Sequence, residues 1–236
     1  MLNPDLDAAA LAAQFRLKRR LQVRNFLQPE IAERLHDCLR REVPWGLAYR
    51  EAKGPVLAQA ETLARLSDAE RAELTRKIHG TAAGEFQFAY NSYMMITAYK
   101  EKRDPHLALH GVVEFLNSPP FIEFVKRVTG VDDIVKANAQ ATRYVAGHFL
   151  KRHDDSVGDQ GRHRKIAYVI NLSRDWQADW GGLLEFMDDA GQVTDVYMPI
   201  FNSLTLFAVP TWHQVSYVAP FAPGERYAIT GWAISY

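Results

Sequence analysis

The second half of this chain is a succession of short β-like segments separated by turn residues, and this rhythm constrains the fold more than any other feature. From about residue 134 onward, glycine or proline stands in the breaks, as at Gly158, Gly181-Gly182 and Pro210. Many short strands at such regular spacing predict a sandwich or barrel. The expected strands are 134–145, 165–172, 182–187, 193–199, 203–208, 213–218 and 226–234.

The first half is expected to be mainly helical. Its pattern predicts an alanine-rich helix over 4–20, a strand over 21–27 and a helix that begins at Pro29 and runs to about residue 43. Ser67 and Glu70 form a capping-box pattern, which predicts a helix over 68–79. A strand over 86–96 and helices over 105–116 and 119–129 complete this half. We therefore expect one α+β domain over 1–236, in which 1–133 gives helical support with one or two strands and 134–236 forms the β core.

Composition excludes several classes of function. Lys plus Arg and Asp plus Glu both number 28, so the formal net charge is zero and no nucleic-acid partner is indicated. The one cysteine, Cys38, cannot form an intrachain disulfide. No apolar run reaches the roughly 20 residues that a membrane span needs. These features lead us to expect a cytoplasmic protein without a membrane partner.

Two histidines and a carboxylate form the candidate metal site. His153 and Asp155 are two residues apart after a strand-like segment, and on an extended backbone such side chains point to the same side. A third ligand, His213, stands at the edge of a later strand. Two imidazoles and one carboxylate leave coordination positions open, as in non-haem Fe(II) oxygenases. The His-x-Asp letters alone are weak, because a surface histidine followed by a turn-forming aspartate gives the same pattern.

A guanidinium in the last predicted strand strengthens this interpretation. Arg226 opens the segment Arg226-Tyr227-Ala228-Ile229-Thr230-Gly231-Trp232, and burial among Tyr227, Ile229 and Trp232 would require a planar anionic partner. A dicarboxylate such as 2-oxoglutarate can supply it, with one carboxylate on the arginine and the 2-keto acid end on iron. An ordinary structural Arg–Glu pair is the alternative.

Several motifs together resemble a known family. Tyr144, His153-Asp154-Asp155, Asp175-Trp176, the segment 181–186, His213-Gln214-Val215 and the segment 226–232 are similar to the catalytic domain of prolyl 4-hydroxylase-type dioxygenases. The resemblance is greatest to the intracellular branch that includes ribosomal and oxygen-sensing prolyl hydroxylases. It covers about 134–236 well, and the segments 21–43 and 86–95 resemble that branch's N-terminal support less specifically.

This resemblance implies a double-stranded β-helix, or jelly roll, with supporting N-terminal helices. It implies that His153, Asp155 and His213 are catalytic ligands of Fe(II), and that Arg226 and Tyr144 bind the co-substrate 2-oxoglutarate. O₂ would be the second co-substrate, ascorbate an accessory reductant, and succinate and CO₂ the products. An aspartate at 155, rather than alanine or glycine, favours hydroxylation over halogenation. At 171 this chain carries Asn171 where oxygen-sensing relatives have a second co-substrate tyrosine.

The resemblance points to a prolyl residue in a protein or peptide as the substrate, with Arg162, Trp212 and Trp232 near it. Three alternatives stay open: a hydroxylase of a free amino acid or small metabolite, a non-catalytic barrel that senses 2-oxoglutarate or metal, and a zinc enzyme. Other histidines are weaker metal candidates. His106 and His110 have helical spacing but lack the glutamate of a zinc hydrolase, and neither His148 nor His163 has a carboxylate two residues on.

Overall fold

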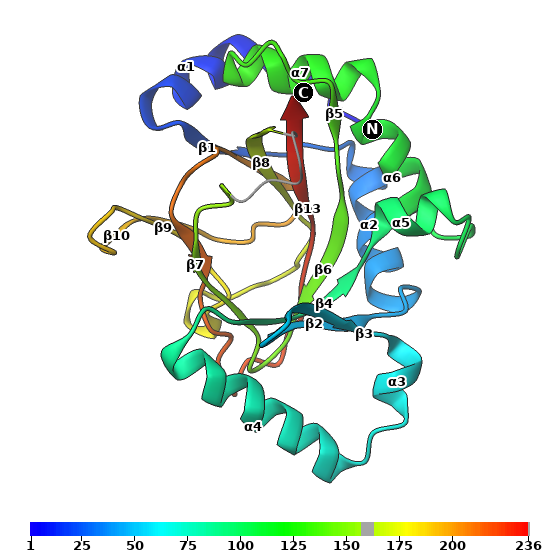
Figure 1. Ribbon diagram of the computed structural model, residues 1–236. Helices are drawn as coiled ribbons and strands as arrows, with labels where there is room; N and C mark the ends of the chain where they lie inside the picture. Colours follow the sequence, from blue (N-terminus) through cyan, green and yellow to red (C-terminus); the bar gives the residue numbers. More distant parts are fainter. Residues whose placement is uncertain (157–162, 236) are drawn as a thin grey trace.

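The computed structural model describes residues 1–156 and 163–235 (Figure 1). Its α-helices are α1 Ala8–Lys18, α2 Pro29–Arg41, α3 Ala60–Ala64, α4 Asp68–Gly84, α5 Met95–Lys100, α6 Leu109–Leu116 and α7 Pro119–Thr129. Its strands are β1 Arg20–Arg24, β2 Gly46–Glu51, β3 Gly54–Ala58, β4 Phe88–Tyr93, β5 Lys136–Ala137, β6 Gln140–Tyr144, β7 Phe149–His153, β8 His163–Asn171, β9 Leu184–Met187, β10 Val193–Tyr197, β11 Ser203–Ala208, β12 His213–Val215 and β13 Arg226–Ser235. The short 3-10 helix η1 covers Ala178–Trp180.

The strands form a near-closed antiparallel barrel with the double-stranded β-helix topology. Their order is β1-β11-β8-β13-β6-β4-β7-β12-β9-β10, so β1 and β4 from the first half of the chain pair with strands of the second half. β4 pairs with both β6 and β7 and thereby joins the two sides of the barrel. The predicted fold class, a jelly-roll core with N-terminal supporting helices, is confirmed.

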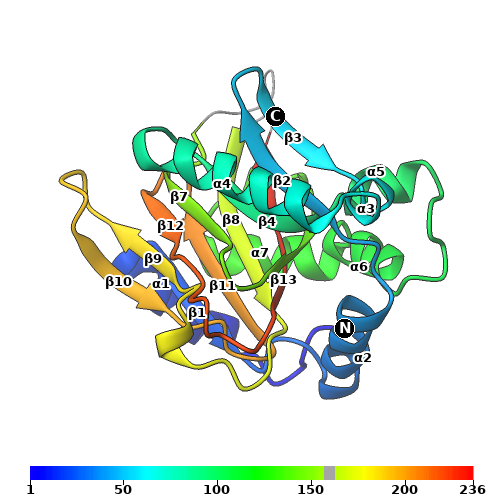
Figure 2. The same ribbon diagram turned by 90° about the horizontal axis from the view of Figure 1, so that it is seen from below.

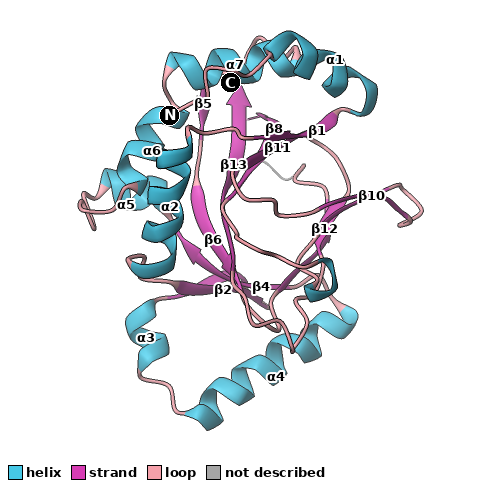
Figure 3. Ribbon diagram, turned by 180° about the vertical axis from the view of Figure 1, so that it is seen from behind, coloured by secondary structure: helices cyan, strands magenta, loops and turns pink. Residues whose placement is uncertain are grey.

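The main hydrophobic core lies between the outer face of the sheet and the helices. Helices α1, α2, α6 and α7 cover this face, as Figure 3 shows from behind. Phe15 of α1, Leu39 of α2 and Phe121 of α7 are fully buried against Leu206 of β11 and Ile229 of β13. Because side chains alternate along a strand, the other face of β13 and β8 is left to line the interior of the barrel.

Helix α4 covers a different part of the barrel. Ile78 packs in a small cluster with Tyr49 of β2, Ala89 of β4 and Phe149 of β7, and Figure 2 shows α4 lying across these strands. Its predicted capping box is present, because the Ser67 hydroxyl accepts from the Glu70 amide while the Glu70 carboxylate accepts from the Ser67 amide. The helix continues to Gly84, further than the predicted end at residue 79.

The first half contains more strand than the sequence pattern predicts. Four strands lie within 1–133, whereas one or two were expected. The additional hairpin, β2 with β3, pairs through β2 with β4 and extends the sheet. Its residues lack a continuous apolar alternation, so its pairing depends on contacts made after the chain folds. The predicted strand over 86–96 is shorter, since α5 already begins at Met95.

The helices of the described residues include none that is both long enough and apolar enough to cross a membrane.

Candidate metal centre

Three side chains from two neighbouring strands and one turn meet inside the barrel. His153 ends β7 and His213 begins β12, and these two residues are directly opposite each other in the antiparallel pair. The carboxylate of Asp155 reaches both, with Oδ1 3.4 Å from His153 Nε2 and Oδ2 3.6 Å from His213 Nε2. One ligand atom from each residue lies within 4.8 Å of the others, which suits a single metal ion.

Asp155 reaches the two histidines through a backbone conformation that differs from the extended one predicted from the sequence. β7 ends at His153, and Asp155 adopts a left-handed backbone conformation with φ 62°. The Asp154 carboxylate accepts from the amide of Ser156 at 3.0 Å and so stabilises this turn. The expectation that strand alternation aligns His153 with Asp155 is therefore wrong, and a tight turn after the strand produces the convergence instead.

Hydrogen bonds orient all three candidate ligands. His153 Nδ1 lies 2.9 Å from the Lys151 carbonyl oxygen, and His213 Nδ1 lies 2.7 Å from that of Thr211. Each imidazole can donate from Nδ1 to a carbonyl, which leaves the Nε2 lone pair directed at Asp155. The indole of Trp232 donates to Asp155 Oδ2 at 2.8 Å.

Burial favours the protonation states that a metal needs. It lowers the pKa of His213 to about 4, against the ordinary 6.5, and so keeps that imidazole neutral. Burial alone would raise the pKa of Asp155, but the two histidines and the Trp232 indole hold it below its ordinary value. Neutral imidazoles and an ionised carboxylate are the forms that bind a divalent cation.

Arg226 is a buried cation, and two of its nitrogens have no hydrogen-bond partner among the described residues. Its side chain is 3% exposed, and Nε and Nη1 are buried with no hydrogen-bond partner among the described residues. The expected neighbours are partly wrong, because Tyr227 and Ile229 belong to the main core on the opposite face of β13. Trp232 lies on the same side as Arg226 and lines the same cavity. An unpaired buried guanidinium is costly, so this group fits an anionic ligand.

Tyr144 is the neighbour of Arg226 across the sheet. The two residues are directly opposite each other on β6 and β13, and the Arg226 guanidinium carbon lies 5.0 Å from the Tyr144 ring centroid. The ring stacks on Tyr90 at 5.2 Å. Burial raises the pKa of the Tyr144 hydroxyl, which keeps it protonated and able to donate. Tyr144 therefore lies where its hydroxyl can assist Arg226.

Two glycines allow a loop to approach Arg226 closely. Gly181 and Gly182 both have positive φ, at 69° and 62°. A Cβ on Gly181 would collide with the Tyr217 carbonyl oxygen, and one on Gly182 would lie 3.6 Å from Arg226 Cδ and 3.2 Å from a ring carbon of Trp176. The Gly-Gly motif thus has a physical role beside Arg226, since glycine adopts positive φ readily and has no Cβ to collide with these neighbours.

One cavity of about 640 Å³ is lined by the three candidate metal ligands and by Arg226 and Tyr144. Several residues that line this cavity were not predicted from the sequence. Phe86, Phe88 and Tyr90 project from alternate positions on and before β4 and form a row of rings that ends on Tyr144, with centroids 6.0, 5.5 and 5.2 Å apart. Their spacing of two was a signal for a shared face. Arg164 lines the cavity as well.

Of the other residues expected near the site, some line the cavity and others lie outside it. Trp232 lines the cavity, but Trp212 does not: its ring lies 4.0 Å from the Arg152 guanidinium carbon and its indole donates to Asp189. Arg162 lies outside the described residues. Asn171 is buried on β8, where Nδ2 donates to the Ser203 hydroxyl at 3.2 Å. It is not one of the described residues that line the cavity.

The remaining histidines do not join a metal site. Among the described residues, His153, Asp155 and His213 are the only group of three arranged to hold an ion. His110 Nε2 instead lies 2.8 Å from the Arg103 carbonyl oxygen, and His148 Nδ1 accepts from the Val145 amide at 3.3 Å. These contacts leave the His–Asp–His group as the candidate centre.

Comparison with known proteins agrees with this geometry. Residues 139–234 match the model of the 2OG-Fe(II) oxygenase superfamily, whose members use Fe(II), 2-oxoglutarate and O₂. This segment is therefore similar to the 2OG-Fe(II) oxygenase superfamily. The chain is similar to Prolyl 3-hydroxylase OGFOD1 of Mus musculus, at 27% identity over 140 residues, which are 56% of this chain and 24% of the relative. The chain thus matches about a quarter of that relative's length.

Solved structures share the fold. A Pseudomonas putida prolyl-4-hydroxylase has a TM-score of 0.59 at 16% identity, over 97% of this chain and 98% of the other. A Trichoplax adhaerens prolyl hydroxylase, solved with a peptide fragment of the hypoxia inducible factor oxygen degradation domain, has a TM-score of 0.63 at 17% identity, over 97% of this chain and 89% of the other. At these identities the likeness establishes the double-stranded β-helix fold.

Proposed function

We propose that this protein is an Fe(II)- and 2-oxoglutarate-dependent hydroxylase of prolyl residues in a protein or peptide, which converts 2-oxoglutarate to succinate and CO₂. One observation carries the proposal: two buried, unpartnered nitrogens of Arg226 share a cavity with a preorganised His–Asp–His group. A ligand with a carboxylate at one end and a metal-chelating group at the other fits both features.

In this proposal each side chain has a defined task. His153, Asp155 and His213 would hold Fe(II) through Nε2 and carboxylate oxygens, with the Nδ1 contacts keeping both rings in place. Arg226 and Tyr144 would hold the far carboxylate of 2-oxoglutarate. The bound iron would supply the O₂ chemistry that oxidises a substrate C–H bond. The apolar cavity walls would keep water away from the reacting groups.

The row of rings supports a prolyl substrate. Phe86, Phe88 and Tyr90 line the cavity that contains the metal centre, and Phe86 lies 6.0 Å from the His153 ring. An apolar pyrrolidine ring packs well on such a surface, and proline-containing segments commonly bind aromatic-lined grooves. Phe86 is 40% exposed, so the row begins at the protein surface, where a polypeptide can approach. A free amino acid would be expected to favour a site closed from solvent.

The two alternative classes of protein, a non-catalytic sensing barrel and a zinc enzyme, predict different behaviour. A sensing barrel would bind 2-oxoglutarate without turnover, yet here both the metal group and the arginine are complete. A zinc enzyme would retain activity with zinc in place of iron, whereas the proposed hydroxylase would lose it. The lone cysteine, buried at Cys38, suits a reducing compartment, and we propose a cytoplasmic location.

The decisive experiment is anaerobic absorption spectroscopy with Fe(II) and 2-oxoglutarate on wild type, His153→Ala and Arg226→Ala. We expect a weak visible charge-transfer band in wild type that disappears in His153→Ala and needs far more 2-oxoglutarate in Arg226→Ala. Mass spectrometry of proline-containing peptides, incubated aerobically with ascorbate, should then show the gain of one oxygen atom. Absence of the band in wild type, together with tight zinc binding, would overturn the proposed function.

A further inference from the structure

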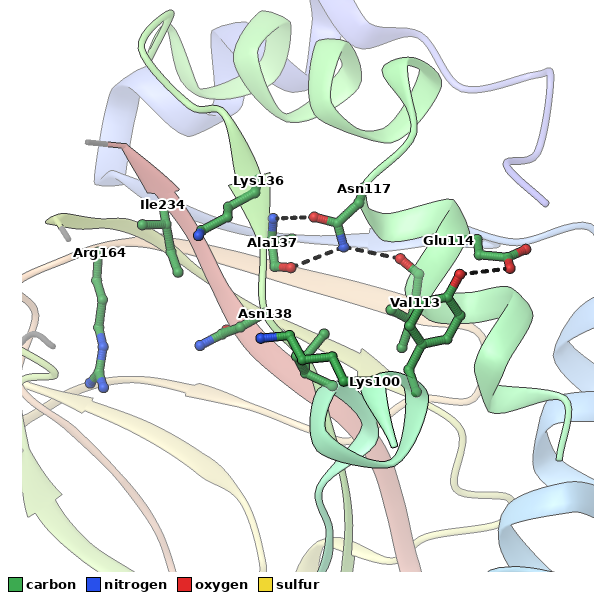
Figure 4. A pocket seen from close by; sticks show the side chains of 11 residues that line it. Lys100, Val113, Glu114, Asn117, Lys136, Ala137, Asn138, Arg164 and Ile234 are labelled. Atoms are coloured by element: carbon green, nitrogen blue, oxygen red, sulfur yellow. Dashed lines mark hydrogen bonds between the residues drawn. The ribbon is translucent and has the colours of Figure 1, made fainter. Parts of the chain in front are cut away.

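A second cavity lies beside the end of β13, between helices α5 and α6 and strand β5. Its volume is about 390 Å³, and Figure 4 shows its lining side chains. Four of them present nitrogen groups from separate segments of the chain: Lys100, Lys136, Asn138 and Arg164. Because these groups come from α5, β5, the β5–β6 link and β8, the fold itself assembles them.

Charge in this cavity favours an anion. Three lining side chains are cationic, and Glu114 is the only acid among the described lining residues. The Glu114 carboxylate accepts from the Tyr99 hydroxyl at 3.0 Å, and in Figure 4 it lies on the side away from Arg164. Lys136 already has an interaction partner. Lys100 and Arg164 therefore present positive charge to this space, which a carboxylate can neutralise.

Asn138 adds a directed hydrogen-bond donor. Its Oδ1 accepts from the Trp232 amide at 2.7 Å, and its own carbonyl oxygen accepts from the Tyr168 hydroxyl at 2.5 Å. These contacts fix the orientation of the side-chain amide. The nitrogen ends of Asn138, Lys136 and Lys100 point toward the side of the cavity on which Arg164 lies (Figure 4).

Part of the remaining wall is apolar, which argues against a purely inorganic anion. Ile96 of α5, Val113 of α6 and Ile234 of β13 line the same space. A register shift between Ala233 and Ile234 changes the direction of the strand at this point. A ligand that carries an acid on an apolar stem, within a short piece of polypeptide, matches both the walls and the volume.

Arg164 connects this cavity to the candidate active site. It is a lining residue of both cavities. Its guanidinium carbon lies 3.7 Å from the Trp232 ring centroid, and Nη1 lies 4.0 Å from Asp155 Oδ1. A chain that occupies both cavities would therefore pass next to the metal centre.

We propose that this second cavity binds an acidic side chain of the peptide substrate while the residue to be oxidised enters the metal-containing cavity. This inference rests on the proposed function, because it requires a peptide substrate. Arg164 holds the substrate carboxylate at the boundary between the cavities, and Lys100 and Lys136 surround it. The predicted substrates are segments that carry an aspartate or glutamate near the target residue.

Peptide binding can be measured without iron or 2-oxoglutarate, by fluorescence anisotropy. The probes are labelled proline-centred peptides with an aspartate at varied offsets, and matched peptides with asparagine or lysine there. We expect the best aspartate peptide to bind wild type about tenfold more tightly than its asparagine counterpart, since one charge-assisted contact is worth roughly 1.4 kcal/mol. The variants Lys100→Glu and Lys136→Glu should remove this preference.

Matched variants separate the proposal from general effects. Lys102→Glu makes the same charge change on an exposed lysine that does not line the cavity, and it should keep the preference. Lys100→Gln and Lys136→Gln test the charge loss if the glutamate variants fold poorly. In turnover assays the cavity variants should raise KM for the aspartate peptide and leave kcat unchanged.

The outcomes distinguish this inference from the proposed function. Equal binding of aspartate and asparagine peptides would overturn the acidic subsite even if both were hydroxylated. An acidic preference without any hydroxylation would support the subsite and contradict prolyl hydroxylation. Free succinate that displaces the aspartate peptide at the same concentration as the unlabelled peptide would mean a small-anion site and would also overturn the inference.

Discussion

At the scale of single residues, Arg226 is distinguished by a buried guanidinium whose Nε and Nη1 have no hydrogen-bond partner among the described residues. A guanidinium that is buried without a partner costs free energy, and the fold retains it on β13 beside Tyr144. If Arg226 binds 2-oxoglutarate as proposed, this group lowers the stability of the ligand-free protein and raises its affinity for the ligand, and one substitution tests both effects.

We predict that Arg226→Met stabilises the ligand-free protein or leaves its stability unchanged, because it replaces an uncompensated buried charge with an apolar chain of similar length. Wild type should gain about 2.7 kcal/mol from 2-oxoglutarate at a hundred times its Kd, and the methionine variant should gain none. Thermal denaturation with and without anaerobic Fe(II) and 2-oxoglutarate measures both effects. Arg226→Lys, which keeps the charge, is the control. A methionine variant that keeps the full ligand-induced shift would contradict this role.

His148 determines part of the pH dependence of stability. Burial lowers its pKa to about 4 from the ordinary 6.5, so the unfolded chain binds a proton at a higher pH than the folded one. The stability that the neutral form provides is complete above pH 6.5 and falls as the pH decreases toward 4. The largest loss corresponds to about 3 kcal/mol. Denaturant unfolding of the metal-free protein across this range should show a shallower fall for His148→Asn. Identical slopes would mean that His148 does not titrate as described.

At the scale of single elements, local sequence signals account for several boundaries. The Ser67–Glu70 capping box begins α4 where predicted, and α7 begins at Pro119 and is capped after Thr129 by Gly130, with φ 70°. These positions satisfy backbone groups that the helix ends leave open. The hairpin of β2 and β3 has no comparable signal. Its strands are stabilised by pairing with β4, a contact that no local pattern encodes.

We predict that Ser67→Ala lowers the free energy of unfolding by about 1 kcal/mol, because the Glu70 amide loses its acceptor at the start of α4. Ser67→Thr keeps a hydroxyl at this position and should be close to wild type. Urea denaturation, followed by circular dichroism, compares the three proteins. An equal loss of unfolding free energy in both variants would show that side-chain size, rather than the capping hydrogen bond, matters at this position.

At the scale of the whole molecule, the N-terminal segment covers an edge of the barrel. β1 pairs with β11 along its full length, and Leu21 and Val23 are buried by this contact. Without β1, the fully buried strand β11 would present an unpaired edge to solvent. Exposed apolar edges of this kind pair with other chains.

A deletion series tests this role of β1. Removal of 1–27 should expose β11 and cause self-association, whereas removal of 1–18 deletes α1, keeps β1 and should lower stability without promoting association. Size-exclusion chromatography with light scattering distinguishes these results. A monodisperse monomer after removal of 1–27 would show that β1 is not needed to protect the edge.

The catalytic half was more predictable than the N-terminal half. All seven strands expected after residue 134 are present, and β11 has the predicted bounds, Ser203–Ala208. Their boundaries follow from glycine, proline and apolar runs, which act locally. β7, which carries His153, was foreseen only as a strand-like segment before the motif. The supporting strands β2 and β3 were missed because their stability comes from distant partners.

The sequence by itself determined the alternation of strands and turns, the helix caps and the identity of the candidate site residues, because each depends on a residue and its near neighbours. The tertiary structure decided how these side chains meet. It placed Asp155 through a left-handed turn, set His213 opposite His153, and turned Tyr227 away from Arg226. It also assembled the row of rings and the cationic second cavity from separate segments. Such contacts depend on the free energy of pairing distant parts of the chain, which no local pattern contains.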